Sequence, residues 1–264
     1  SRSHTSFVNH ARTDHLVTRK RGGYAIPDKI SAAASHSYEY PSLVVIFMET
    51  RTLRNRLSQL HASAVHDVLS QFGCENFVLP PTIKPLNKQQ KLAGPIFTIE
   101  GRLTTSHTPH ETLIEWTSLL SSIPQNYVAV CQPHTSEVAL MGQLSAETLQ
   151  KRGVIGYLVD GGCRDVAIIN ALDFPVFYSF NTPKDVVGRW IPTKLGTPII
   201  IGDCLIQKED YILADVDGAI VIPNKHLEET INQAELVLRT ESAVRKAIMT
   251  GMDPKEAYLK FGKF

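Results

Sequence analysis

The chain has 264 residues, of which 43% are hydrophobic and 20% charged, and its formal net charge at pH 7 is +1. A chain of this length buries about three quarters of its unfolded surface, so we expect one substantial core plus an appendage, with no need for disulfides. The near-zero charge argues against nonspecific polyanion binding by the body of the chain, and we therefore expect no nucleic-acid partner.

The cysteines and the longest apolar run exclude two further classes of protein. Cys74, Cys131, Cys163 and Cys204 lie far apart and form no CxxC pair. This usage favours a reduced compartment over a disulfide framework or a zinc site, so we expect a cytoplasmic protein. The apolar run SLVVIFM at residues 42–48 is much shorter than the roughly 20 residues of a membrane helix, and we expect no membrane span.

The first 27 residues predict a tail rather than a folded element. They carry five Lys or Arg residues against one acidic residue, Asp14, and show no helical periodicity. We place an N-terminal arm or extension at residues 1–50 and the folded domain at residues 51–264. An Arg-rich, acid-poor composition is also typical of organelle transit peptides, so targeting stays open beside a flexible or partner-packed arm.

Helices and strands are then predicted in alternation. From Leu53, apolar residues recur at three- and four-residue spacings up to a terminating glycine, Gly73, which predicts a single helix. The following segments are a strand at 93–103, a helix at 110–123, a strand at 126–133, a helix at 142–153 and a strand at 154–160. The strand, helix, strand order within about 35 residues predicts a βαβ unit with a right-handed crossover over a parallel pair.

The last third of the chain is β-rich and ends in helices. Strands are expected at 174–179, 197–207 and 210–223, a long helix from about 225 to 246, and a shorter helix at 254–261. Two apolar runs flank the sequence DVDG at 215–218, which indicates a hairpin turn. A calcium loop is the alternative, but the EF-hand pattern requires a further ligand before its glycine and a glutamate beyond it, and both are missing.

An arginine and an aspartate, Arg164 and Asp165, follow the strand predicted at 154–160. In open α/β sheets, ligands bind beyond the carboxyl ends of the strands. The loop at 139–145 should reach the same edge, because the strands before and after its helix would be parallel neighbours. Gly142 permits close backbone approach, and the next three amides, of Gln143, Leu144 and Ser145, would point outward at a helix N-terminus and favour a carboxylate.

These groups together predict a site for an anion and a cation. The Arg164 guanidinium could bind the same carboxylate bidentately, while Asp165 is a hard oxygen ligand suited to Mg²⁺ or Mn²⁺ held mainly through waters. The pattern indicates a 2-oxo acid with a divalent metal. A surface ion pair and a glycine in a tight turn explain the same residues without a function, and both alternatives stay open at this point.

The segment GQLSAETLQKRGVIGYLVDGGCRDV resembles the signature of one family, which contains the 4-hydroxy-4-methyl-2-oxoglutarate/4-carboxy-4-hydroxy-2-oxoadipate aldolases and the regulator of ribonuclease activity A proteins. The pieces AVHDVLSQFG, LAGPIFTI, FPVFYS and DYILADVDGAIVIP agree in order, so the similarity covers about residues 53–261. The resemblance implies an α/β fold, a swivelling β/β/α sandwich with a helical N-terminal region and a C-terminal helix. It also implies a homotrimer or homohexamer with sites near subunit interfaces.

By motif position, the resemblance implies that Arg164 binds the carboxylate and keto oxygen of a pyruvyl group. It implies that Asp165 coordinates Mg²⁺ or Mn²⁺, and that the amides from Gly142 to Ser145 hold the carboxylate. Catalytic members cleave a carbon–carbon bond to release pyruvate enolate, and many decarboxylate oxaloacetate. A metal and Arg164 would stabilise the charge that develops on the keto oxygen, and one such donor typically contributes about 3–4 kcal/mol.

One position departs from the family pattern. The aldolases usually carry an acidic residue 21 positions before the arginine, where it helps position water for proton transfer; here Gln143 occupies that position. An amide cannot take a proton, and losing a true general base costs about 10²–10⁴ in rate. Decarboxylation needs no base to form the enolate, so we predict a metal-dependent decarboxylase or weakened aldolase. The alternative is a noncatalytic member that modulates a protein partner such as a ribonuclease.

Other titratable residues have ordinary explanations beside functional ones. His134, just after the strand at 126–133, is either an acid or base near neutral pH or a simple loop histidine. Cys163 abuts Arg164, but no histidine is near in sequence, so a buried thiol is expected rather than a nucleophile. Capping, solvent exposure or packing accounts for His107, His110, His66 and Asp67. Neither a P-loop nor a GxGxxG follows a predicted strand, which argues against a nucleotide-dependent enzyme.

Overall fold

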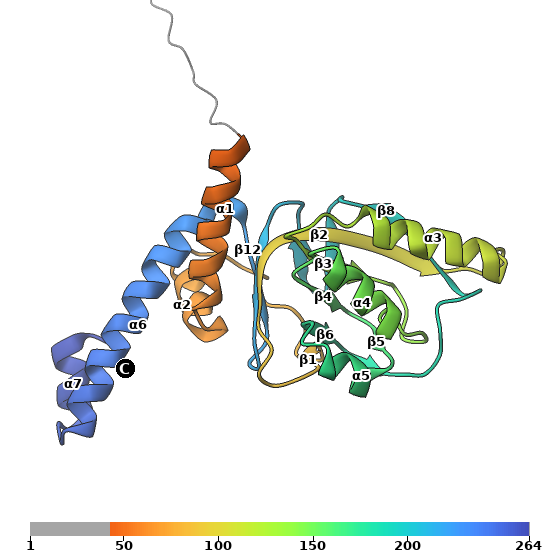
Figure 1. Ribbon diagram of the computed structural model, residues 1–264. Coiled ribbons are helices and arrows are strands. Elements are labelled where there is room, and N and C mark those ends of the chain that lie inside the picture. The colour runs from red at the N-terminus through yellow and green to blue at the C-terminus, as the bar shows by residue number, and fades with distance from the viewer. Residues whose placement is uncertain (1–42, 264) are drawn as a thin grey trace, which may run out of the picture. The chain divides into compact units, whose positions relative to one another are not determined.

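A computed structural model of the chain describes residues 43–263 (Figure 1). Most of the predicted arm, residues 1–42, lies outside the described residues, and so does Phe264. The described helices are α1 (Leu43–Ser58), α2 (Ala62–Gln71), α3 (Pro109–Ser122), α4 (Gln143–Lys151), α5 (Val166–Ala171), α6 (Leu227–Met249) and α7 (Pro254–Phe261), with a 3₁₀ turn at Asn224–His226. In residues 43–263, no helix is long and apolar enough to cross a bilayer.

The strands form one large sheet and two short two-stranded pairs. In the large sheet the order is β1 (Lys84–Pro85), β6 (Val176–Tyr178), β4 (Gly156–Val159), β3 (Val128–Gln132), β2 (Leu92–Leu103), β11 (Tyr211–Ala214) and β12 (Ala219–Ile222), with β8 (Trp190–Leu195) also paired to β2. The short pairs are β9 (Ile199–Ile201) with β10 (Cys204–Ile206), and β5 (Gly162–Cys163) with β7 (Phe180–Asn181). Strands β2, β3, β4 and β6 run parallel, which confirms the predicted βαβ unit with α4 as its crossover.

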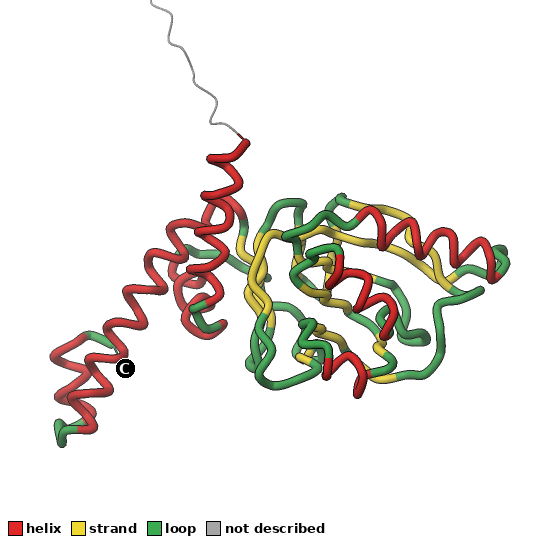
Figure 2. The backbone as a smooth tube through the Cα atoms, viewed as in Figure 1, coloured by secondary structure: helices red, strands yellow, loops and turns green. Residues whose placement is uncertain are grey.

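Alternating side chains of the central strands build two cores on opposite faces of the sheet. Ala129 and Cys131 of β3 pack with the core that contains α3 and α4, whereas Val128 and Val130 pack with β9 and β10. Because both faces are covered, β3 is buried along its whole length, as continuous apolar runs predict. Helices α3, α4 and α5 lie on the near face of the sheet in Figure 2. This layering of β-hairpin, sheet and helices is the predicted α/β sandwich.

The prediction of a single helix from Leu53 to Gly73 is wrong. Two helices, α1 and α2, are separated by residues 59–61, of which His61 is extended, with φ −105° and ψ 148°. The break is stabilised from a distance, because the N–H of Ala62 donates to the buried carboxylate of Asp215 at 2.9 Å. The periodicity continues across the break because both helices face the same core. Helix α2 ends at Gln71, and the predicted terminator Gly73 follows two residues later in the left-handed region, with φ 72°.

The C-terminal helices and the predicted hairpin are present. Asp215 N–H donates to the Gly218 carbonyl at 3.0 Å, which closes the turn between β11 and β12. Helix α6 joins α1 and α2 in a third core over β11 and β12. The guanidinium of Arg56 on α1 pairs with the Glu235 carboxylate on α6 at 2.9 Å. Helix α1 begins at Leu43 and so runs across the predicted domain boundary at residue 50.

Candidate functional site

Two loops meet at the carboxyl ends of β3 and β4. The first enters α4 through Gly142, and the second leaves β5 through Arg164 and enters α5 at Asp165. Backbone hydrogen bonds join them: Arg164 N–H donates to the Met141 carbonyl at 2.9 Å, and Leu140 N–H donates to the Gly162 carbonyl at 2.8 Å. The predicted convergence of these loops is therefore present, and both rest on the buried core beneath α3 and α4.

Glycine at position 142 is favoured by the close approach of neighbouring side chains and not by its backbone conformation. Its φ of −148° is extended and open to any residue. A Cβ atom at this position would lie 3.0 Å from the Nε of Arg164 and 3.0 Å from an oxygen of Asp165. A side chain here would therefore push the Arg164 guanidinium and the Asp165 carboxylate away from the start of α4 by a few tenths of an ångström.

Asp165 is held by an unusual backbone conformation and by the start of α4. Its φ of 55° and ψ of 29° lie in the left-handed region, which Asp tolerates better than most residues. One carboxylate oxygen, Oδ2, accepts the Gln143 N–H at 3.0 Å. Of the three amides predicted to hold a ligand carboxylate, one is thus bonded to Asp165. The amides of Leu144 and Ser145 remain in a first turn that receives no side-chain cap from Gly142.

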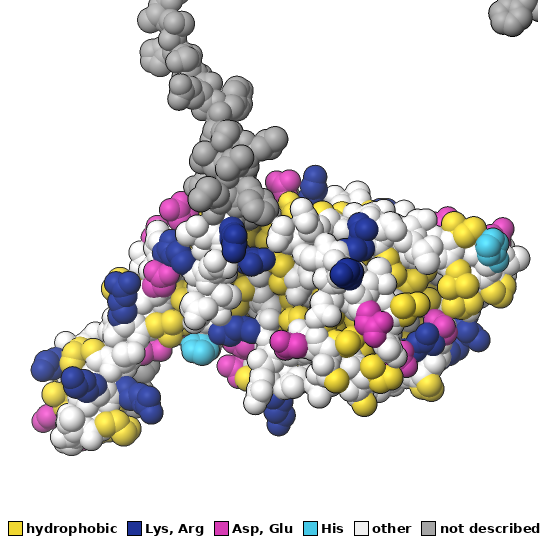
Figure 3. Space-filling view, viewed as in Figure 1, with side chains coloured by type: hydrophobic (Ala, Val, Ile, Leu, Met, Phe, Trp, Pro, Cys, Tyr) yellow, Lys and Arg dark blue, Asp and Glu magenta, His cyan; other side chains and the backbone are white. Residues whose placement is uncertain are grey.

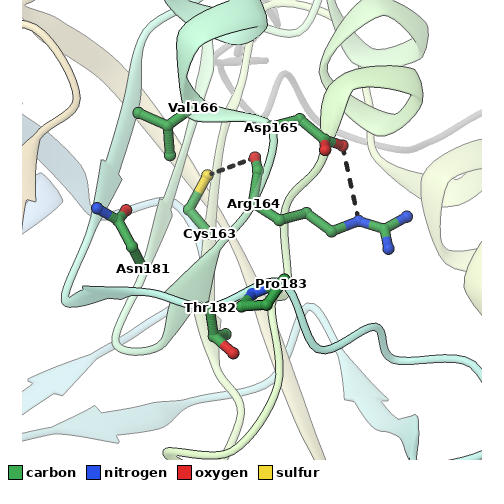
Figure 4. Close-up of a pocket in the computed structure, with 7 residues that line it drawn as sticks. All are labelled: Cys163, Arg164, Asp165, Val166, Asn181, Thr182 and Pro183. Atoms are coloured by element: carbon green, nitrogen blue, oxygen red, sulfur yellow. Dashed lines mark hydrogen bonds and ion pairs between the residues drawn. The ribbon is translucent and has the colours of Figure 1, made fainter.

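Arg164 lies between two carboxylates. Its Nε is 3.6 Å from Oδ2 of Asp165, and its Nη1 is 3.0 Å from Oδ2 of Asp185. Figure 4 shows the Arg164 and Asp165 side chains lying on the same side, away from Asn181. One positive and two negative groups leave this cluster with a net charge of −1, which favours a bound cation.

Asp185 was not anticipated from the sequence. It reaches the site because Ala139, in the loop before α4, bridges both Gly162 and Asp185 in parallel. The other Asp185 oxygen accepts the N–H of Val186 at 2.7 Å, so both of its oxygens are occupied. This placement depends on pairing between segments distant in sequence, and the residues around Asp185 carry no local signal of it.

The neutral residue at the position of the family's acid has a carboxylate beside it. Gln143 Nε2 donates to Oε1 of Glu147 at 2.9 Å, one turn further along α4. Because a carboxylate only accepts hydrogen bonds, this contact fixes which end of the amide faces Glu147. The spacing of four residues on a predicted helix was the signal that sequence reasoning missed.

Arg164 borders two cavities. The first has a volume of about 390 Å³ and is drawn in Figure 4; it is lined by Cys163, Arg164, Asp165, Val166, Asn181, Thr182 and Pro183. The second, of about 280 Å³, lies over α3 and α4 and shares Arg164 with the first. Asp165 is 37% exposed and Arg164 36%, so both side chains remain open to a small ligand.

The donor set at Asp165 fits one class of metal ion. Across residues 43–263, no three His, Cys, Asp or Glu side chains gather so that they could hold a metal by themselves. Zn²⁺ normally needs three or four nitrogen or sulfur ligands, so the site does not suit it. Mg²⁺ binds through one or two carboxylates and keeps several waters, and the second oxygen of Asp165 supplies such a ligand. Mn²⁺ has the same preference for oxygen ligands.

The remaining sequence candidates lie elsewhere or are inert. Burial raises the pKa of the Cys163 thiol to about 12, so the expected buried thiol is confirmed. His134 Nε2 pairs with Oε1 of Glu100 at 2.9 Å rather than with Arg164 or Asp165. Helix α3 is capped by Thr108 and not by a histidine. His66 contacts the ring of Phe77 and the Asp67 carboxylate; Asp67 also pairs with Lys263 at 3.2 Å.

Comparison with known sequences identifies relatives over most of the chain. A family profile described as RraA-like, Aldolase/RraA, matches residues 62–221. Protein DlpA of Legionella pneumophila is 28% identical over 219 residues, which are 80% of this chain and 34% of DlpA, so the chain spans about a third of that relative. A protein named "Putative 4-hydroxy-4-methyl-2-oxoglutarate aldolase" from Halalkalibacterium halodurans is 26% identical over 69% of this chain and 83% of its own length. An uncharacterized protein of Methanocaldococcus jannaschii is 31% identical over 66% and 81%, respectively.

Solved structures share the fold. A chain described under novel cellulases from microbes associated with the gut ecosystem has a TM-score of 0.69 and 27% identity, covering 80% of this chain and 90% of its own. Streptomyces coelicolor RraAS2, described as an unusual member of the RNase ES inhibitor RraA protein family, has a TM-score of 0.65 and 22% identity, covering 74% and 96%. The second likeness bears on the fold alone.

Proposed function

This chain belongs to the Aldolase/RraA family, and we propose that it is a divalent-metal-dependent carbon–carbon lyase acting on small 2-oxo acids. The reaction is decarboxylation of oxaloacetate, retro-aldol cleavage of 4-hydroxy-2-oxo acids with release of pyruvate, or both. The observation that carries the proposal is the meeting of Arg164, Asp165 and the first turn of α4, to which Gly142 gives no side-chain cap, beside two cavities.

Arg164 and the first turn of α4 bind and orient the substrate. The substrate carboxylate accepts hydrogen bonds from the N–H groups of Leu144 and Ser145, and its keto oxygen faces the Arg164 guanidinium. When the C3–C4 bond breaks, its electron pair moves toward the C2 oxygen, and the fixed positive charge of Arg164 stabilises the resulting enolate. A divalent cation held by Asp165 would, when bound, polarise the same oxygen as a Lewis acid.

Proton transfer separates the two reactions. In decarboxylation, C4 leaves as CO₂ and C3 of the enolate takes one proton from water to give pyruvate. In retro-aldol cleavage, the 4-hydroxyl must also lose a proton, and Gln143 cannot accept it. Glu147, one turn further along α4, accepts the Gln143 amide N–H through Oε1, so the proton would have to reach its other oxygen or water rather than the residue at position 143. We therefore expect decarboxylation of oxaloacetate to be less impaired than cleavage of a dicarboxylic aldol substrate.

A coupled pyruvate assay tests the proposal. Oxaloacetate and 4-hydroxy-4-methyl-2-oxoglutarate are supplied to the full chain with Mg²⁺ or Mn²⁺, and then with a chelator. Metal-dependent pyruvate release is expected, together with a loss of at least about 100-fold in Asp165→Ala. Asp203→Asn, an exposed acid in the β9–β10 turn, is the matched control. The proposal is abandoned if the chelator leaves the rate of pyruvate release unchanged and Asp165→Ala releases pyruvate at the wild-type rate.

A noncatalytic role is the second candidate, favoured by the neutral Gln143 at the acid's position. The chain would then bind and modulate a protein partner such as a ribonuclease. The same assay separates the two, because a binding protein gives no metal-dependent turnover but inhibits the ribonuclease in a direct cleavage assay.

Assembly and location form part of the same proposal. We infer a homotrimer or homohexamer in the cytoplasm, in which the predicted arm ends before α1 at Leu43 rather than at residue 50. Apolar side chains exposed on α3 and α4 support self-association, since Ile114 is 49% and Leu144 76% exposed. Light scattering of the full chain measures the copy number directly.

A further inference from the structure

One face of α4 lies along α5 and carries three polar side chains, those of Gln143, Glu147 and Gln150. Spacings of four and three residues place them on the same side of the helix. The Gln150 amide donates to the Leu172 carbonyl, just past the end of α5, at 2.7 Å. At the other end of this face, the Gln143 backbone N–H donates to the Asp165 carboxylate, where α5 begins. Glu147 therefore lies on the α5 side of α4, one turn beyond the residue that holds Asp165.

The hydrogen bond between the Gln143 and Glu147 side chains has a direction. Nε2 of Gln143 donates to Oε1 of Glu147 at 2.9 Å. Since a carboxylate only accepts, the amide nitrogen must face Glu147, and the amide oxygen must face the opposite way, toward the start of α4. Within residues 43–263, no group of the chain donates to that oxygen. An unpartnered neutral oxygen is thus held near Asp165, and Mg²⁺ and Mn²⁺ prefer oxygen ligands and retain water.

Helix stability does not explain why Glu147 bonds to Gln143. Lys151 follows Glu147 by four residues, and a glutamate four residues before a lysine is the favourable order for an ion pair on a helix. In the part of the chain that the structure describes, the Glu147 carboxylate nevertheless bonds to the Gln143 amide. This choice of partner fixes the orientation of Gln143, which an ion pair with Lys151 would leave free.

Glu147 also brings a negative charge close to the cluster at the start of α5, whose net charge is −1. Two further guanidinium groups lie along the second cavity: Arg152 donates to the Ser121 carbonyl at 2.6 Å, and Arg189 donates to the Val187 carbonyl at 3.1 Å. Figure 3 shows acidic and basic side chains interspersed on the face where Figure 1 places α4 and α5. A test of Glu147 must therefore separate its charge from its effect on Gln143.

We propose that Glu147 is a positioning residue of the metal site. It orients the Gln143 amide so that the amide oxygen accepts a hydrogen bond from a water in the hydration shell of the divalent cation at Asp165. The inference rests on the proposed function, because it takes Asp165 as the ligand of the cation. Gln143 then still orients water, although it cannot take a proton, in agreement with a site that favours decarboxylation over retro-aldol cleavage.

Mn²⁺ binding to the full chain, without substrate, tests the inference apart from catalysis. Electron paramagnetic resonance counts the free Mn²⁺ and gives its Kd. Residues that hold the surroundings of a metal typically change its affinity by about 10- to 100-fold, so Gln143→Leu and Glu147→Gln should each weaken Mn²⁺ binding to that extent. Leucine removes the amide oxygen, and a glutamine at position 147 both donates and accepts, so it no longer fixes the orientation of Gln143.

The double variant separates orientation from charge. If Glu147 acts through Gln143, the variant with both substitutions binds Mn²⁺ no more weakly than Gln143→Leu alone. If Glu147 acts by its charge, the two losses multiply, and the inference is wrong. Urea unfolding of the same preparations should keep the wild-type midpoint in all three variants, because the pair lies on the helix surface.

An equivalent pair on α6 supplies the matched control. Nε2 of Gln233 donates to Oε1 of Glu229 at 2.7 Å, also four residues apart, so Glu229→Gln should leave Mn²⁺ binding unchanged. Mn²⁺ binding that is lost in Asp165→Ala but unaffected in Gln143→Leu and Glu147→Gln overturns the inference and leaves the lyase proposal standing. Absence of Asp165-dependent Mn²⁺ binding overturns both. The expected coupling without any pyruvate release in the coupled assay supports the inference and overturns the lyase proposal.

Discussion

Replacing Gly142 by alanine should damage the site without damaging the fold. The new Cβ would lie 3.0 Å from both Arg164 Nε and an Asp165 oxygen, whereas ordinary contact begins near 3.4 Å. Both groups must then move by about 0.4 Å. A misplacement of 1 Å costs about 100-fold in rate, so a proportionate loss in kcat/KM is about sixfold. The backbone at φ −148° accepts alanine, and the unfolding free energy should change by no more than about 0.5 kcal/mol.

Pyruvate release and urea unfolding, measured on the same preparations, separate the two effects. Gly73→Ala gives the opposite signature: its φ of 72° is strained for alanine, yet no atom lies within 4 Å of the added Cβ. That variant should lose about 1 kcal/mol of stability and keep its kcat/KM. The reasoning is refuted if Gly142→Ala keeps full kcat/KM, or if its loss is matched by an equal loss of stability.

Three further outcomes can be checked on the purified chain. Asp215→Ala removes the buried acceptor of the Ala62 and Asp217 N–H groups. This variant should lower the free energy of unfolding, measured in urea, by about 2–4 kcal/mol. Asp215→Asn keeps an acceptor and should lower it by less than half as much. The hydrogen bond from Arg56 holds the pKa of Glu235 below its ordinary 4.5. The Arg56–Glu235 pair therefore stabilises the fold by at most about 1 kcal/mol, and this contribution is present above pH 4.5. The difference in unfolding free energy between wild type and Glu235→Gln should shrink as the pH falls below 4.5. Burial raises the pKa of Cys131, Cys163 and Cys204 to about 12, so native alkylation at pH 8 should label Cys74 alone, counted by mass spectrometry.

Local patterns were sufficient to predict most of the sheet and its helices. The βαβ unit from β3 to β4 follows from two apolar runs around one amphipathic segment, and the hairpin at 215–218 follows from turn residues. The break between α1 and α2 could not be predicted, because it depends on Asp215, more than 150 residues away in the chain. A periodic apolar pattern reports which face is buried, and it does not report where a distant carboxylate interrupts the helix.

The site divides in the same way. The proximity of Gly142, Arg164 and Asp165 was predictable, because a strand end and a helix start must lie at one edge of a parallel sheet, while their role as a ligand site stays a prediction. Asp185 was not, since it arrives through the bridge to Ala139 from a segment without regular structure. The residues at the strand end and helix start are therefore easier to predict than the shape of the cavity beside them. The apolar lining of the second cavity, which lies over α3 and α4, depends on segments that pack together only in the folded chain.

Stability does not account for the arrangement of Arg164, Asp165 and Asp185. Ion pairs whose side chains are about one third exposed contribute at most about 1 kcal/mol each, and the left-handed Asp165 costs a comparable amount. A surface ion pair would need neither a glycine 3.0 Å away nor a carboxylate that takes the first amide of α4. These features raise the local negative charge and keep Arg164 at the mouth of two cavities. That placement would strengthen the binding of an anionic ligand and a cation, whereas it adds little to the free energy of folding. This difference favours a binding site over a simple ion pair.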